Sequence, residues 1–329
     1  MSGPIVCFGE LLLRLSAPGR ELLMQSPRLD IVVGGAEANV AAGLAALDHP
    51  TAIVSTVPDN ALGRGAVAAM RAAGVDTSRV ATGPGRLGLY FMSPGAGVRA
   101  ADIVYDRAGS AFVEADGYDW PALLDGAARL HLSGITPALG HASAAHALAA
   151  ARAARAAGVP VSFDGNYRAR LWESWDSDPR GVLTELVAQA DLFFGNHRDV
   201  ALLTGRDVRE ARAAAEVAFA AFPNLTAIAS TARTVIDADH HRLSARFDTP
   251  DAAYETDEIA VTGIVDRIGG GDAFAAGILH GLHAGLSPQE TVEAGLALAA
   301  LKHSLPGDFS RFTRADLAAF QAGARDVRR

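Results

Sequence analysis

One stretch near the C-terminal end of the chain, Asp266-Arg267-Ile268-Gly269-Gly270-Gly271-Asp272-Ala273-Phe274, joins a run of bare backbone to a carboxylate. Phe274, Ile278 and Leu282 follow at helical spacing, so a loop leads here into a helix N-terminus. Such a junction offers unpaired N–H groups and the positive end of the helix dipole, which suit a phosphate or a developing oxyanion. Asp272 could simply cap the helix. A cap needs no glycine run, whereas close approach of a ligand does, so the stretch predicts an anion site with Asp272 beside it.

Two common phosphate-binding loops do not match this spacing. A Walker loop requires a lysine directly after its last glycine, and Asp272 stands there. The dinucleotide fingerprint requires a third glycine at the position of Phe274 and belongs to the first βα unit of its domain. The stretch therefore predicts a phosphate site of another kind.

A second glycine motif, Gly34-Gly35-Ala36-Glu37-Ala38-Asn39, lies near the start of the chain. It resembles the N-terminal signature of the ribokinase-like (PfkB) carbohydrate kinases, and residues 266–279 resemble the C-terminal signature of that family. In the family, the glycine loop forms an anion hole and its Asp is the catalytic base. The resemblance therefore implies that Asp272 is the base and that the amides of Gly269, Gly270 and Gly271 bind the transferred phosphate.

Two loop arginines indicate the class of acceptor. Arg107 and Arg168 stand close in the sequence to Tyr90, Tyr105 and Tyr167, in a chain with only 6% aromatic residues. A guanidinium binds a carboxylate through paired, charge-assisted hydrogen bonds. Most surface arginines are merely solvated beside an acid, but a neutral sugar would not need two of them. The pattern therefore favours a sugar acid.

Three further stretches, residues 132–136, 164–168 and 302–308, resemble the 2-keto-3-deoxygluconate kinases within this family, as does the Asp266-Arg267 pair. The resemblance implies phosphorylation of 2-keto-3-deoxygluconate to 2-keto-3-deoxy-6-phosphogluconate with ATP and Mg²⁺. The implied sugar-acid contacts are Gly34, Gly35, Asn39, Tyr90, Tyr105, Arg107, Ile135, Arg168 and Asp272. The implied nucleotide contacts are Asn196, Ser230, Arg233, Gly269, Gly271, Lys302 and His303. Asn196 and Asp199, in place of the usual Asn-x-x-Glu, would reach Mg²⁺ indirectly.

The elements that must position these residues alternate between strand and helix. Short apolar runs predict strands at residues 5–8, 51–57, 130–133, 160–164 and 192–194. Helical spacing predicts a helix after Gly35 that includes Val40, Leu44 and Leu47, and helices near residues 142–157, 209–222 and 313–324. A capping box at residues 287–290 predicts the start of another helix, and residues 226–247 are expected to hold shorter strands. The alternation predicts an α/β fold, a doubly wound, mainly parallel sheet with helices on both faces. Ligands bind such sheets beyond the carboxyl ends of the strands, where the glycine motifs, residues 164–168 and Asn196 all fall.

Residues 11–33 and 87–107 break this alternation. Both mix apolar residues with Pro and Gly, as short strands around turns do. They predict a small antiparallel β lid, which the family resemblance places over the sugar. The remaining residues, 1–10, 34–86 and 108–329, are expected to form a core that binds nucleotide and substrate.

The composition of the chain limits the possible partners and the cellular location of the protein. The chain has 329 residues, a net charge of −8 and one cysteine, Cys7, which excludes an internal disulfide framework. The negative charge argues against nucleic acid or an anionic membrane as partner. No tract is apolar enough to cross a bilayer and the first residues show no secretory pattern, so we expect a cytoplasmic protein. A lid edge often pairs with another subunit, so we expect a homo-oligomer.

Two alternatives stay open at this point. The same chemistry could act on a neutral sugar such as fructose or ribose, or on a nucleoside. A protein of another class would bind a sugar acid as a regulator without turnover. The glycine loop followed by Asp272 argues against the second alternative, because a pure binding protein has no use for that pair.

Overall fold

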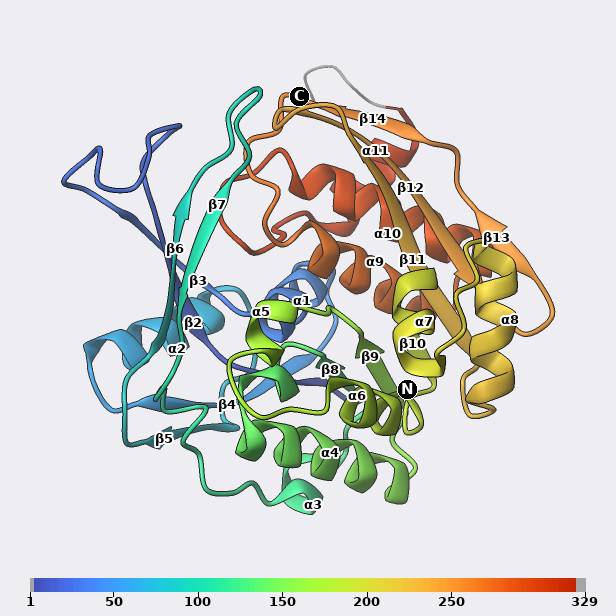
Figure 1. Ribbon diagram of the computed structural model, residues 1–329, viewed down its shortest axis with the longest axis horizontal. Coiled ribbons are helices and arrows are strands. Elements are labelled where there is room, and N and C mark those ends of the chain that lie inside the picture. Colours follow the sequence, from blue (N-terminus) through green and yellow to red (C-terminus); the bar gives the residue numbers. More distant parts are fainter. Residues whose placement is uncertain (1–2, 324–329) are drawn as a thin grey trace.

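A ten-stranded sheet runs through the centre of the computed structural model, which describes residues 3–323 (Figure 1). Its strand order is β13-β12-β11-β10-β9-β8-β1-β4-β5, and β14 pairs with β12. The strands are β1 Ile5–Phe8, β4 Thr51–Pro58, β5 Val80–Gly83, β8 Arg129–Ser133, β9 Val161–Asp164, β10 Leu192–Phe194, β11 Ala227–Val235, β12 His240–Asp248, β13 Ala253–Glu255 and β14 Ile259–Thr262. All neighbours from β5 to β11 are parallel, whereas β12 pairs antiparallel with β11, β13 and β14.

Helices cover both faces of this sheet. On β1, Ile5 and Cys7 face one hydrophobic core while Val6 and Phe8 face the other, which is the alternation of a strand covered on both sides. The first core includes α1 Ala36–Ala46, α2 Ala61–Ala72, α9 Gly270–Ala284, α10 Pro288–Lys302 and α11 Arg314–Gln321. The second includes α3 Trp120–Leu123, α4 His141–Ala156, α5 Ala169–Trp172, α6 Pro179–Val187, α7 His197–Thr204 and α8 Ala211–Ala221. The predicted doubly wound α/β fold is confirmed.

A separate four-stranded sheet stands beside the large one (Figure 1). Its order is β3-β2-β6-β7, with β2 Leu12–Ser16, β3 Asp30–Gly34, β6 Gly88–Ser93 and β7 Asp102–Asp106. The outer pairs are antiparallel and the central pair, β2 with β6, is parallel. We call it the small sheet. It consists of the two stretches expected to form the lid, and a functional division of the chain into lid and core stays a prediction.

A buried ion-pair network joins the small sheet to the loop before α9. The guanidinium of Arg14, on β2, lies 2.6 Å from Asp266 and 3.1 Å from Asp308, and all three side chains are buried. Asp266 also accepts the backbone amides of Ile268 and Gly307, each at 3.0 Å. This network holds the small sheet against the glycine loop.

The stretch 226–247 differs from its expected form. It holds two nine-residue strands, β11 and β12, that form one long hairpin rather than several shorter strands. Only one side of the hairpin is covered, so the polar residues that alternate along β12 lie on its exposed side. Of the last predicted helix, Ala324 falls outside the described residues, and α11 ends at Gln321. No helix within residues 3–323 is long and apolar enough to cross a membrane.

Two helical glycines provide a matched test of packing. A Cβ on Gly277, in α9, would lie 2.7 Å from the backbone of α10, whereas a Cβ on Gly65, in α2, would meet nothing within 4 Å. We expect Gly277→Ala to lower the free energy of unfolding by about 1–3 kcal/mol. Gly65→Ala should raise it by about 0.5–1 kcal/mol, because alanine favours the helix. Denaturant unfolding measures both, and equal midpoints would contradict the close approach of α9 and α10.

Candidate active site

A cavity of about 780 Å³ lies between the two sheets. It is open beyond the carboxyl ends of β8, β9 and β10, and the small sheet provides one wall. The structure brings most of the predicted site residues together here. Those that line the cavity are Gly35, Asn39, Tyr90, Tyr105, Arg107, Ile135, Arg168, Asn196, Arg233, Gly269, Gly270, Gly271, Asp272 and His303.

The glycine loop presents bare amides to this cavity. Gly269 has a φ of 78°, and a Cβ there would overlap the carbonyl oxygen of Asp308, so only glycine fits. No side chain caps α9. Gly270 and Ala273 donate to backbone carbonyls, which leaves the amides of Gly271 and Asp272 without a partner in the described chain. A Cβ on Gly271 would meet nothing within 4 Å, so a ligand can approach both amides.

Asp272 is a half-buried carboxyl beside these amides and does not act as a helix cap. The amide group of Asn39 donates to its Oδ2 at 2.6 Å. Burial raises the pKa of Asp272 to about 7; the bond from Asn39 opposes the rise, while the charges of Asp308 and Glu37 add to it. A carboxyl with a pKa near neutrality is suited to accept a proton during a reaction.

A second carboxyl, Asp164, was not among the predicted site residues. It ends β9 and lines the cavity. Burial, and then the nearby charge of Asp272, raise the pKa of Asp164 to about 8. The sequence signal was its place at the start of the 164–168 stretch, but only the fold shows that it lines the same cavity as Asp272.

The small sheet contributes aromatic and cationic groups. Tyr90 donates to Asp308 at 2.9 Å, and the Tyr105 ring lies 6.2 Å from the Tyr90 ring. Arg107 is buried, and its Nε donates to Glu10 at 2.6 Å. The guanidinium of Arg107 is therefore shared between the cavity and an internal carboxylate that sequence reasoning did not identify.

Arg168 reaches the cavity from the opposite side. Its side chain is exposed, and its NH1 donates to the carbonyl of Tyr167 at 3.0 Å. No carboxylate of the described residues forms a salt bridge with it. Arg168 is thus available to an anionic ligand.

Lys302, which the sequence predicted to contact nucleotide, does not line the cavity. It is fully buried, and its Nζ donates to the Leu305 carbonyl at 3.1 Å. The α10 register turns this side chain inward, among the carboxylates of Asp266, Asp308 and Asp272, whose charges oppose the fall that burial causes in its pKa. Lys302 can influence the site only through its charge.

Three other predicted residues also lie outside the main cavity. Gly34 is buried, and a Cβ there would overlap the Asp308 carboxylate, so this glycine makes room for Asp308 rather than for a ligand. Ser230 lines a neighbouring groove of about 470 Å³ that shares Asn196 and Arg233 with the main cavity. Asp199 lines neither the main cavity nor that groove, and it accepts the backbone amide of Asn196 at 2.8 Å in the capping box of α7.

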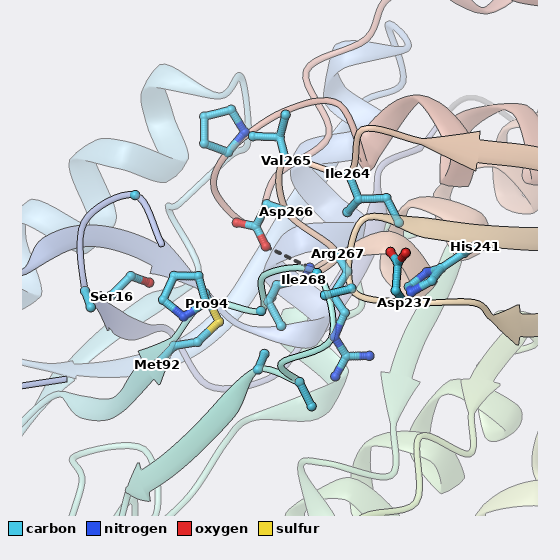
Figure 2. A pocket seen from close by; sticks show the side chains of 18 of the residues that line it. Ser16, Met92, Pro94, Asp237, His241, Ile264, Val265, Asp266, Arg267 and Ile268 are labelled. Carbon is cyan, nitrogen blue, oxygen red and sulfur yellow. Dashed lines mark hydrogen bonds between the residues drawn. The ribbon is translucent and has the colours of Figure 1, made fainter. Parts of the chain in front are cut away.

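A separate cavity of about 680 Å³ lies behind the glycine loop (Figure 2). Met92 and Pro94 of the small sheet and its following turn face Ile264 and Val265 across it. Arg267 and Ile268 line both cavities, so they form the wall between them. The lining of the second cavity is largely apolar and includes neither Asp272 nor the free amides of the glycine loop.

Comparison with known proteins gives consistent results. The family model described as "pfkB family carbohydrate kinase" matches residues 3–310. The 2-dehydro-3-deoxygalactonokinase of Haloferax volcanii is 31% identical over 314 residues, which cover 95% of each chain. The 2-dehydro-3-deoxygluconokinase of Bacillus subtilis is 30% identical over 301 residues, 90% of this chain and 88% of that one.

Solved structures agree closely in fold. The crystal structure of 2-dehydro-3-deoxygluconokinase from Thermotoga maritima matches with a TM-score of 0.92 and 36% identity, over 98% of this chain and 99% of that chain. A PfkB family carbohydrate kinase from Listeria grayi also gives a TM-score of 0.92, with 37% identity over 97% and 99% of the two chains. The likeness therefore covers both sheets of the molecule.

The bond from Asn39 makes the ionisation of Asp272 testable. Asn39→Ala removes a donor to the charged form, so the pKa of Asp272 should rise further, by about one pH unit. The measurement is a titration of aspartate carboxyl carbons by NMR, with the Asp272→Asn spectrum to assign the resonance. An unchanged midpoint in the Asn39 variant would show that the bond does not control the ionisation.

Proposed function

The chain belongs to the pfkB family of carbohydrate kinases, and we propose that it phosphorylates 2-keto-3-deoxygluconate to 2-keto-3-deoxy-6-phosphogluconate with ATP and Mg²⁺. One observation carries the proposal. The free amides of Gly271 and Asp272 and the carboxyl of Asp272 share one end of a cavity, and arginines and tyrosines line its remainder. The relatives named as kinases of 2-dehydro-3-deoxy sugar acids support the choice of substrate.

The residues at the glycine loop account for the transfer step. The acceptor hydroxyl oxygen forms a bond to the γ-phosphorus, the bond to the β-phosphate oxygen breaks, and that oxygen keeps the electron pair. The hydroxyl proton passes to Asp272, which need not ionise the alcohol beforehand because the proton leaves late in a loose transition state. The amides of Gly271 and Asp272 stabilise the charge on the transferred group, and losing one such donor typically lowers the rate about 100- to 1,000-fold.

The carboxylate of the sugar acid is assigned to the arginine-rich part of the cavity. Arg168 has no competing carboxylate partner, and Tyr90 and Tyr105 lie on the wall that the small sheet provides. Arg107 lines the cavity and also forms a salt bridge with Glu10. Gly35, Asn39 and Ile135 complete the sugar pocket in this assignment.

The groove beside the main cavity is proposed for the nucleotide. Asn196, Ser230 and Arg233 line this groove. His303 lines the main cavity together with the glycine loop. A Cβ on Gly270 would come within 2.9 Å of the His303 ring, so this ring supports the loop as well as the pocket.

Mg²⁺ fits this site as an ion bound mainly through the nucleotide. No three His, Cys, Asp or Glu side chains within residues 3–323 gather as ligands. Phosphate oxygens and water would therefore supply most of its coordination, as is usual for this ion. Burial raises the pKa values of Asp164 and Asp199, and a Mg²⁺ bound nearby would favour their charged forms. Asn196 and Asp199 would contact the ion through water.

Assembly and location follow from the same proposal. The edge strands of the small sheet expose Ile31 on β3 and Val104 on β7, and such edges pair readily with another chain. We therefore propose a homo-oligomer. A kinase that draws on ATP and has a single buried cysteine fits the cytoplasm.

Asp272→Asn tests the proposed base. The variant should still bind the sugar acid but lose most turnover, because the amide cannot accept the hydroxyl proton. For the unaltered protein, kcat should rise with pH through about 7, since the raised pKa of Asp272 must be exceeded for the base to be ionised. A coupled assay of ADP release measures both, and near-normal turnover in the variant would remove Asp272 from this role.

Substrate choice is tested with the same assay and a panel of 2-keto-3-deoxygluconate, its galacto epimer, fructose and ribose. Arg168→Ala should raise KM for the sugar acids more than KM for ATP, because it removes a carboxylate partner. It is a cleaner variant than Arg107→Ala, which would also leave the buried Glu10 unpaired. Efficient turnover of fructose or ribose would favour a neutral-sugar kinase, and binding without ADP release would favour a regulator.

A further inference from the structure

Arg267 occupies a place that the proposed function has not used. Its neighbours in the chain are tightly held: Asp266 is ion-paired with Arg14, and the amide of Gly270 donates to the Arg267 carbonyl at 3.3 Å. The Arg267 side chain is exposed and extends away from the Asp266 carboxylate (Figure 2). The backbone is therefore fixed while the guanidinium is free to meet a ligand.

Three arginines from separate segments converge on the active-site cavity. Arg267 precedes the glycine loop, Arg233 lies on β11 and Arg168 follows β9. Burial and then the charges of Arg267 and Arg168 lower the pKa of Arg233, so the guanidinium groups are close enough to repel one another. No carboxylate of the described residues forms a salt bridge with any of the three. Such a cluster would be stabilised by an anionic ligand.

The position of Arg267 along the cavity distinguishes between two anions. The sugar carboxylate is assigned to Arg107, Arg168 and the tyrosines. Arg267 instead stands two residues before Gly269, whose loop turns directly into the free amides of Gly271 and Asp272. A guanidinium there is placed for the phosphate that those amides receive, and its planar donors match two phosphate oxygens at once.

We propose that Arg267 contacts the phosphoryl group in transfer and stabilises its charge together with the amides of Gly271 and Asp272. This inference rests on the proposed kinase function. Arg267 exchanges no proton: the hydroxyl proton goes to Asp272, and the electron pair of the broken bond stays on the β-phosphate oxygen. The guanidinium acts only by its charge and hydrogen bonds, as cationic side chains do in other phosphoryl transfers.

The test compares Arg267→Gln, Arg267→Lys and Arg267→Ala in the full chain. Arg267→Gln should lower kcat about 100-fold, as the loss of one donor to a developing charge does, with little change in KM for the sugar acid. Arg267→Lys should lose less, because it keeps the charge. Guanidinium chloride added to Arg267→Ala should restore part of kcat, which it cannot do for a side chain that merely supports the fold.

Arg170→Gln is the matched control. Arg170 lies on α5, is exposed and lines neither the main cavity nor the adjoining groove, so its variant should keep the kcat of the unaltered protein and show no response to guanidinium. Inhibition by ADP with aluminium fluoride, which imitates the phosphoryl group in transfer, should weaken in Arg267→Gln and stay unchanged in Arg170→Gln.

The outcomes separate this inference from the proposed function. A wild-type chain that releases no ADP with any sugar acid defeats the proposed function. An active wild type with an equally active Arg267→Gln defeats the inference alone. A rise in KM for the sugar acid at unchanged kcat would assign Arg267 to the sugar carboxylate instead, and a loss of kcat that guanidinium never relieves would reduce it to a structural role.

Discussion

The geometry of the active site depends on one buried cation, Arg14, which lies between Asp266 and Asp308. Asp266 also holds the amides of Ile268 and Gly307, so a single network fixes the small sheet, the loop before α9 and the segment after α10 relative to one another. Removing one partner of a buried ion pair typically costs about 3–5 kcal/mol, because the other charge is left buried. The amides of the glycine loop therefore keep their position only while the small sheet stays docked.

Charge is distributed unevenly within the site, although the chain as a whole carries −8. Asp164 and Asp272 both line the cavity, and the charge of Asp272 adds to the rise that burial causes in the pKa of Asp164. Several arginines also line the cavity. Among the described residues, Arg107 forms a salt bridge with Glu10, and the other arginines that line the cavity form none. The arginines can therefore bind anions, while Asp272 can accept a proton near neutral pH. An electrostatic potential of one sign throughout the cavity would not serve both purposes.

Turns of the small sheet also touch the hairpin that lines the groove proposed for the nucleotide. The amide of Ala238, at the turn between β11 and β12, donates to the Gly97 carbonyl at 2.7 Å, and Arg20 pairs with Asp239 at 2.9 Å. β11 of the same hairpin carries Arg233. The walls assigned to the sugar acid and to the nucleotide are consequently parts of one connected structure.

The sequence by itself determined the alternation of strands and helices, the loop that opens α9 and the capping box at Ser287, because each depends on residues a few positions apart. It also identified the family, through several such short motifs in the expected order. The sequence also identified most of the residues that line the cavity, because the carboxyl ends of parallel strands lie at one edge of the sheet, where ligands bind. Only the tertiary structure decided that Lys302 turns inward, that Arg107 is shared with Glu10 and that Asp164 lines the same cavity as Asp272. Those facts depend on burial and on partners far apart in the chain, and local spacing contains no information about either.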